Sequence, residues 1–349
     1  RGYSSAISRR NIGNDLPDSL IQLLHDVTRD SYRLVQRYYR LKSKILNLKP
    51  MTLSDIYAPI PESDRYYTWD QAKSIVLECF EKFDTDFAQK AQLLFDQNRI
   101  HAPIQRNKRG GAFCSGSTPD KAPYVMVNFM GKSRDIATLA HELGHAVHDL
   151  YASKQPLTYY HPILPLAETA SVFAEMTVTD HLLKIETSKQ ARISLLMDKI
   201  EDLIATSHRQ NMFSSFEQNV HKQIETKLIS ADEFCKMYQD ELKAMFGDAV
   251  EIPEIYHWEW AAIPHIFEWP FYVYAYNFGN LLVMALYQTY KEGQNGFHDA
   301  YKALLAAGSS ASPISIMAEA GIDITQREFW KKSLASIETL IDQLDELVD

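Results

Sequence analysis

The most constraining feature of this sequence is an apolar stripe between residues 135 and 150. Its members recur every three or four residues: Ile136, Leu139, Ala140, Leu143, Val147 and Leu150. This spacing places them on one face of an α-helix, and that face must pack against a core. His141 and His145 lie off the stripe and are four residues apart, so their rings project together from another face, one turn apart. The segment predicts a core helix that presents two histidines side by side.

The rest of the chain favours a mainly α fold class. Only 13 of the 349 residues are glycine, and 46% are hydrophobic, which excludes a disordered chain and supports a large core. Helical spacing extends from Asp18 to about Lys49 and again from Thr68 to Asn98. Thr68 and Gln71 match a capping box at the start of the second stretch. Breaks are expected at residues 156–165, 253–270 and 308–313.

A short stretch ahead of the histidine helix differs from the rest of the chain in amino-acid composition. Residues 109–116 are rich in glycine, and residues 124–129 have strand composition. The glycines match neither phosphate-binding pattern, because GK[ST] and GxGxxG are both missing. We therefore expect a small β-sheet or hairpin here, with 124–129 as an edge strand to which an extended peptide adds.

Charge and cysteine content argue against some classes of binding partner and favour one cellular location. The 36 basic and 45 acidic residues give a net charge of −9, which argues against nucleic acid or anionic membrane as the main partner. Basic residues between Arg29 and Lys49 follow helical spacing and are expected on a solvated face. The longest apolar run, residues 281–286, is too short to cross a bilayer. Three widely spaced cysteines (Cys79, Cys114 and Cys235) suggest no disulfide framework and favour a reducing, cytoplasmic location. The oligomeric state stays open.

The two histidines belong to an HExxH motif, His141-Glu142-Leu-Gly-His145. On a helix, this spacing lets two imidazoles reach one zinc ion, with the glutamate as general base. The alternative is an exposed pair of helix histidines that binds nothing. A motif this short also arises by chance in a chain with 12 histidines. The placement on an amphipathic helix favours the metal.

A catalytic zinc needs a third protein ligand, and Glu168 is the candidate. Pro165 suits a first helical position, which would place Glu168 in the first turn of a helix and Glu175 seven residues later on the same face. Glu175 would then orient a ligand histidine. The alternative for Glu168 is an acid favoured by the helix dipole. For Glu175 the ligand-orienting role stays open.

At this point the sequence resembles the oligoendopeptidase F branch of the thimet oligopeptidase-like (M3) metallopeptidases. The matching pieces are residues 141–148, 166–171 and 263–276, preceded by 109–114 and 124–129. The resemblance implies a mainly α, zincin-like helical catalytic domain that hydrolyses short peptides in a confined channel. It also implies that residues 1–105 are a helical lead-in and 106–349 the zinc-site core with C-terminal helices. Relatives carry a further N-terminal lobe, so with Arg1 as its first residue the chain is expected to be their C-terminal catalytic portion.

The third motif adds candidates for stabilising the reaction. His265 and Tyr272 are seven residues apart and Tyr276 is four further on, so a helix from Pro270 would align both tyrosines. In the family that the sequence resembles, a histidine and tyrosines of this region face the zinc and hydrogen-bond the oxyanion. Which tyrosine faces the zinc stays open, although Tyr274 fits a core position better. His148, His161 and His257 are expected to be structural or exposed.

Together these features predict a zinc-dependent endopeptidase with one zinc ion per chain, held by His141, His145 and Glu168. Oligopeptides are the expected substrates, with the cleavage preference undetermined. Two alternatives remain: another zinc hydrolase of the aminopeptidase type, or a non-catalytic peptide-binding fragment that lacks its N-terminal lobe.

Overall fold

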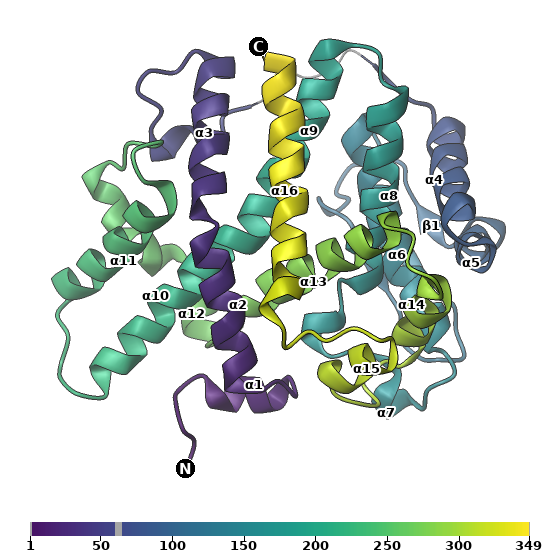
Figure 1. The fold of residues 1–349 in the computed structure, drawn as a ribbon. Coiled ribbons are helices and arrows are strands. Elements are labelled where there is room, and N and C mark those ends of the chain that lie inside the picture. The colour runs from purple at the N-terminus through teal and green to yellow at the C-terminus, as the bar shows by residue number, and fades with distance from the viewer. Residues whose placement is uncertain (1, 60–64, 349) are drawn as a thin grey trace. The chain divides into compact units, whose positions relative to one another are not determined.

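The computed structural model describes residues 2–59 and 65–348, which form helices and one small sheet (Figure 1). The mainly α fold class is confirmed. The chain divides into two units. Unit 1 comprises residues 1–61, 196–281 and 325–349, and unit 2 comprises 62–195 and 282–324. The division falls within two helices, α9 (Lys189–Leu203) and α13 (Tyr274–Lys291). No helix in the described part of the chain is both long enough and apolar enough to cross a membrane.

Unit 1 is built entirely around helices. Its elements are α1 (Ser8–Gly13), α2 (Asp18–Asp30), α3 (Tyr32–Leu46), η1 (Leu53–Asp55), the π-helical η3 (Ile204–His208), α10 (Arg209–Ile224), α11 (Ala231–Phe246), η4 (Glu254–Ala262), α12 (Pro264–Glu268) and α16 (Arg327–Val348). The helical stretch predicted from Asp18 to Lys49 is therefore two helices, interrupted at Ser31. The side chains of Tyr38, Tyr238 and Trp330 are fully buried in its core.

The basic residues of α3 lie largely on the solvated face expected from the sequence, since the Arg33 side chain is 69% exposed and that of Arg40 is 53% exposed. Arg33 pairs with Glu338 at 2.9 Å, and Arg37 pairs with Asp345 at 2.8 Å and also with Asp342. These acids line α16, which runs beside α3 (Figure 1). One basic residue of the stretch, Lys42, is completely buried and pairs with Glu201. Periodicity identified the helix but not the acidic helix that neutralises it.

Unit 2 holds the predicted histidine helix in its core. Its elements are α4 (Trp69–Phe83), α5 (Thr85–Asp96), α6 (Ser133–Ala152), α7 (Leu157–Tyr160), η2 (Leu164–Leu166), α8 (Thr169–Ile185), α14 (Phe297–Ala306) and α15 (Pro313–Glu319). The capping box is confirmed, since Thr68 and Gln71 exchange the two expected hydrogen bonds. The apolar stripe of α6 is buried except at its last member, Leu150, which is half-buried. The helix packs most extensively on α8, which lies beside it (Figure 1).

The small sheet of unit 2 precedes α6. Its strands are β1 (Ile100–His101), β2 (Phe113–Ser115) and β3 (Tyr124–Met126), in the order β1-β3-β2. The predicted hairpin is present, because β2 and β3 pair antiparallel. The predicted edge strand is wrong: β3 is central, since β1 pairs with its other side in parallel. The two-residue β1 was too short for a sequence pattern, and among the described strands β2 forms an edge.

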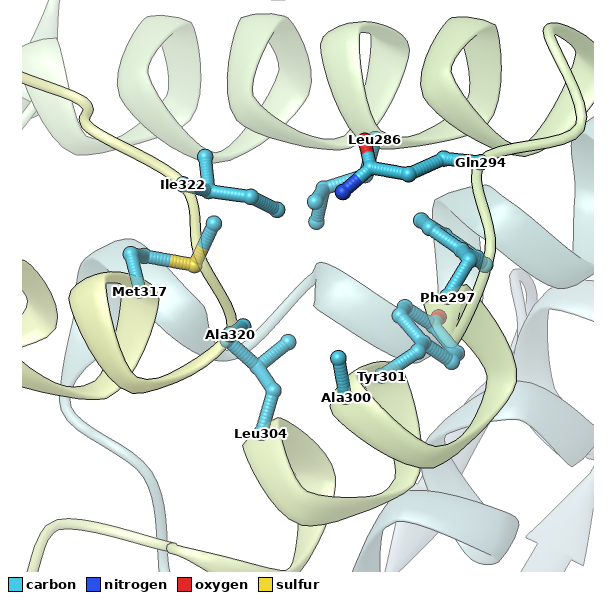
Figure 2. Close-up of a pocket in the computed structure, with 9 residues that line it drawn as sticks. All are labelled: Leu286, Gln294, Phe297, Ala300, Tyr301, Leu304, Met317, Ala320 and Ile322. Carbon is cyan, nitrogen blue, oxygen red and sulfur yellow. The ribbon is translucent and has the colours of Figure 1, made fainter.

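One small gap remains in the packing of unit 2. Figure 2 shows apolar side chains from α13, α14 and α15 and from the segment after α15 around it. The gap has a volume of about 10 Å³, room for roughly one water molecule. Its lining is Leu286, Gln294, Phe297, Ala300, Tyr301, Leu304, Met317, Ala320 and Ile322. With so little space and so few polar groups, it is a packing imperfection and not a ligand site.

Candidate metal centre

The two histidines of α6 converge as their spacing predicts. Their ring centroids are 5.0 Å apart, with the ring planes at 80°. The Nε2 atoms of His141 and His145 each lie 3.4 Å from the same oxygen, Oε2 of Glu168. Both rings are about three-quarters buried, so α6 directs them inward from one face of the helix. Helix geometry therefore brings together two of the three predicted ligands.

Glu168 reaches the histidines from the start of α8, although not as predicted. Pro165 lies inside the short η2 and not in α8, which starts at Thr169, so Glu168 is the N-cap residue and not part of the first turn. The hydroxyl of Ser171 donates to Oε2 of Glu168 at 2.6 Å. This bond fixes the carboxylate and was missed from the sequence, where the three-residue spacing of Glu168 and Ser171 was its only signal.

A glycine sets how closely the two helices approach. A Cβ atom built on Gly144 would lie 2.6 Å from the carbonyl oxygen of Ala170 and 2.6 Å from the Cα of Ser171. These are backbone atoms that cannot swing away, so a larger residue would separate the helices. The glycine inside HExxH thus permits the approach that brings Glu168 to the histidines.

The three side chains fit a zinc ion. One donor atom from each of His141, His145 and Glu168 lies within 4.8 Å of the others, and this is the one such group found among the described His, Cys, Asp and Glu residues. Two atoms bound to one zinc ion at about 2.1 Å and at the tetrahedral angle are about 3.4 Å apart. The two measured Nε2 to Oε2 distances match this separation. A His-His-Glu set leaves a fourth position for water.

The other nitrogens of the two rings are also held. Nδ1 of His141 lies 3.2 Å from Oε2 of Glu175, so an Nδ1–H donated to this carboxylate leaves Nε2 free to bind a metal. The ring of His145 hydrogen-bonds the backbone of Ala167. The distance between Glu175 and His141 therefore agrees with the predicted ligand-orienting role of Glu175. Each ring therefore has a second hydrogen-bond partner besides its approach to Glu168.

Burial and the mutual contacts shift the pKa values of the cluster. Burial opposes the ionisation of Glu168, but hydrogen bonding and charge from the histidines lower its pKa to about 2. Burial also opposes the protonation of His141, yet Glu168 and Glu175 raise its pKa to about 10. Burial lowers the pKa of His145 to about 4. The two carboxylates thus hold a proton on His141, at the place where a cation would bind, while the imidazole of His145 is neutral.

Glu142 lies beside the ligands without belonging to them. Its side chain is 7% exposed, and burial raises the pKa of its carboxyl. The backbone N–H of Cys114 in β2 hydrogen-bonds this carboxylate. The bond was not predicted, because it comes from backbone and leaves no mark in the residue types. A raised carboxyl pKa suits a group that must first take up and then release a proton.

The third predicted motif lies in unit 1 and forms a cluster of its own. The hydroxyl of Tyr276 is 3.4 Å from Nε2 of His265, and the rings of Tyr272 and Tyr276 are 5.4 Å apart. The predicted helix from Pro270 is wrong, because α13 begins at Tyr274. Tyr272 instead belongs to the turn before α13, yet it still meets Tyr276.

The remaining aromatic and histidine candidates agree with the sequence. Tyr274 is completely buried and accepts a hydrogen bond from Asn14 at 2.8 Å, which confirms a core position. His148 is buried, His161 is exposed with its ring tilted against that of Tyr160, and His257 is half-buried. None of these three histidines joins the metal-binding group.

An HExxH helix joined by a carboxylate from a second helix defines a metallopeptidase-type centre. Residues 1–336 match peptidase family M3, and the chain belongs to that family.

Its relatives are oligoendopeptidases. Chromosomal oligoendopeptidase F of Lactococcus lactis subsp. cremoris is 30% identical over 352 residues, which cover 100% of this chain and 58% of that protein. Oligopeptidase PepF of Bacillus subtilis (strain 168) is 30% identical over 350 residues, covering 99% of this chain and 52% of that protein. The chain therefore spans little more than half the length of these relatives.

Solved structures show the same likeness. The crystal structure of oligoendopeptidase-F from Enterococcus faecium superposes with a TM-score of 0.79 at 25% identity, covering 100% of this chain and 56% of that one. A Chlamydophila abortus crystal structure gives a TM-score of 0.91 at 28% identity, with coverage of 99% and 58%. The predicted resemblance to the oligoendopeptidase F branch is confirmed.

Proposed function

We propose that this protein is a zinc-dependent endopeptidase that hydrolyses short oligopeptides. The observation that carries the proposal is the convergence of His141, His145 and Glu168 beside the buried carboxyl of Glu142. Membership of peptidase family M3 supports it. One zinc ion per chain would be held by the two Nε2 atoms and the Glu168 carboxylate.

The chain's own residues divide the chemistry between them. When bound, zinc lowers the pKa of water towards ~7 and polarises the scissile carbonyl. Glu142 accepts a proton from the attacking water and later delivers it to the leaving amine nitrogen. The carboxylate of Glu175 holds the Nδ1–H of His141, so that this ring keeps one tautomer throughout.

His265 and Tyr272, with Tyr276, are proposed to donate hydrogen bonds to the oxyanion that develops on the substrate. Their clustering and their partial exposure in unit 1 support this role. Loss of one such donor typically lowers kcat by ~10²–10³. Tyr272→Phe should show a loss of this order with the zinc content unchanged.

The substrate is proposed to add to the edge strand β2. Val125 and Val127 donate to the β1 side, so in the antiparallel ladder Phe113 and Ser115 bond to β3, and the backbone of Cys114 faces outward. That outward N–H is held by the Glu142 carboxylate, so a peptide that adds to β2 would take over this hydrogen bond and lie directly beside the base.

A cytoplasmic location is also proposed. It is supported by the three cysteines, which form no disulfide and so suit a reducing compartment.

Metal content tests the proposal first. Elemental mass spectrometry of the purified chain should find one zinc per chain, and Glu168→Ala should lose it. A quenched-peptide assay then follows, with each peptide supplied both with a blocked and with a free amino terminus. Cleavage of blocked peptides supports an endopeptidase, and a strict need for a free amine would instead indicate an aminopeptidase. Zinc without any cleavage would favour a peptide-binding role.

A further inference from the structure

The loop between α12 and α13 makes a tight turn over residues 269–272. The N–H of Tyr272 donates to the carbonyl of Trp269 at 3.1 Å, which closes the turn. Pro270 occupies its second position, and Phe271, at the third, has a φ of +55°. A proline followed by a residue with positive φ identifies a type II turn. Tyr272, one of the proposed oxyanion donors, is its last residue.

Phenylalanine is a poor residue for this third position. Type II turns place glycine or asparagine there, because a Cβ atom disfavours positive φ. Rotating the Pro270–Phe271 peptide by about half a turn would give a type I turn, in which Phe271 has a relaxed negative φ. Local sequence therefore favours the other turn type, and something outside the turn must hold this peptide in its observed orientation.

Two side chains from distant helices hold both ends of that peptide group. Arg10 of α1 donates to the carbonyl of Pro270 through Nε at 3.2 Å and Nη2 at 3.1 Å. Glu217 of α10 accepts from the N–H of Phe271 at 2.8 Å. Glu217 is 2% exposed, and the Phe271 ring packs 4.7 Å from the ring of His221. A rotated peptide would lose all of these hydrogen bonds and leave the Glu217 carboxyl buried without this donor.

We propose that Arg10 and Glu217 are positioning residues, which lock the Pro270–Phe271 peptide and thereby direct Tyr272 towards His265 and Tyr276. The observed ring contacts agree, since Tyr272 stacks 5.7 Å from His265 and the Arg10 guanidinium lies 5.8 Å from the Tyr272 ring centroid. This inference rests on the proposed function, because the tyrosines matter only if they act on the substrate. It adds two residues that contact no substrate themselves.

Substitutions at Glu217 test whether its hydrogen bond to Phe271 positions Tyr272, separately from any effect on the stability of the whole protein. Glu217→Gln keeps an oxygen that accepts the Phe271 N–H, whereas Glu217→Leu removes it at similar volume. We expect Glu217→Leu to lower kcat about 10–100-fold with KM within about twofold, since misplacement of a catalytic group affects the transition state most. Glu217→Gln should retain most of kcat. Glu241→Leu, which removes a similarly buried carboxylate that pairs with Arg29, is the matched control and should keep kcat.

Hydrogen exchange gives a second readout that does not depend on activity. In Glu217→Leu the amide of Phe271 should exchange at least about tenfold faster, with α10 still protected. Unchanged exchange at Phe271, or equal losses of kcat in Glu217→Gln and Glu217→Leu, would contradict the positioning role of Glu217. If Glu217→Leu fails to fold, Arg10→Met tests the other end of the same peptide. Wild-type kcat in Tyr272→Phe would instead refute the oxyanion role, and the exchange result would still decide whether the peptide is locked.

Discussion

Glu142 and Glu175 are both carboxylates beside the metal ligands, but their contacts differ. Glu142 contacts no nitrogen of the proposed ligands and accepts a hydrogen bond from the backbone N–H of Cys114. Glu142→Gln keeps the size and removes the base, so we expect a full zinc content with kcat lowered by at least ~10³. Parallel metal analysis and kinetics check this result. Substantial turnover in the zinc-loaded variant would exclude Glu142 as the base.

Glu175 contacts the proposed ligand His141, so we expect it to affect metal binding. Glu175→Gln replaces a charged acceptor of the His141 Nδ1–H by a neutral one, and should weaken zinc affinity about 10–100-fold. At saturating zinc, kcat should remain close to that of the wild type. Competition with a chelator measures the affinity. Asp180→Asn is a control on the same helix, since Asp180 bonds Tyr287 and Lys291 and no ligand; an equal effect there would contradict the assignment.

Glu217 gives a pH-dependent stability with a defined sign. Burial raises its pKa to about 7, although the Phe271 N–H and the charge of Arg10 oppose the rise, from an ordinary value of 4.5. The folded state thus keeps a proton that the unfolded state releases, and the free energy of unfolding falls as pH rises from about 4.5 to about 7. The loss is at most about 3 kcal/mol.

Urea unfolding of the wild type and of Glu217→Gln measures this loss. The glutamine variant should gain stability relative to the wild type across the same pH interval. Glu319→Gln removes a solvent-exposed acid and should leave the pH dependence unchanged. A constant difference between the wild type and Glu217→Gln from pH 4.5 to 7 would contradict the assigned pKa.

At the scale of elements, the contact of α6 with α8 sets the geometry of the metal centre. Gly144→Ala adds a methyl group within 2.6 Å of the backbone of α8, so the helices must separate and Glu168 must move away from the histidines. We expect a lower zinc affinity and a lower melting temperature. Gly13→Ala is the control, because its added methyl group meets nothing within 4 Å. Zinc affinity unchanged in Gly144→Ala would show that the site tolerates the displacement.

Sequence reasoning succeeded where an element obeys local rules. The helix of His141 and the cap of Thr68 follow from spacing and residue type, and both are present. It failed where the local structure depends on residues far away in the sequence. The strand 124–126 became central because a two-residue strand, β1, pairs with its far side. Tyr272 ends a turn whose Phe271 N–H is bound by Glu217, more than fifty residues away in the sequence.

At the scale of the whole molecule, the three proposed metal ligands all belong to unit 2. Because a ligand stabilises the part of the protein that binds it, chelation should act locally. After treatment with a chelator, amide exchange should increase in α6 and α8, whereas α2, α3 and α16 of unit 1 should change little. Exchange mass spectrometry with and without added zinc measures both units at once. A uniform increase across both units would mean that the metal supports the fold as a whole.

The pairing of α3 with α16 has a consequence for how the chain is made. Arg33 and its partner Glu338 are 305 residues apart in the sequence. During synthesis at about 5–20 residues per second, α3 leaves the ribosome tens of seconds before α16 exists. For that interval its arginines face no acidic helix, and the apolar side of α3 lacks one of its covering elements. A nascent chain of this protein therefore displays a basic, amphipathic helix whose arginines have not met their partners on α16 and whose apolar side is only partly covered, and this interval is when a chaperone would have something to bind.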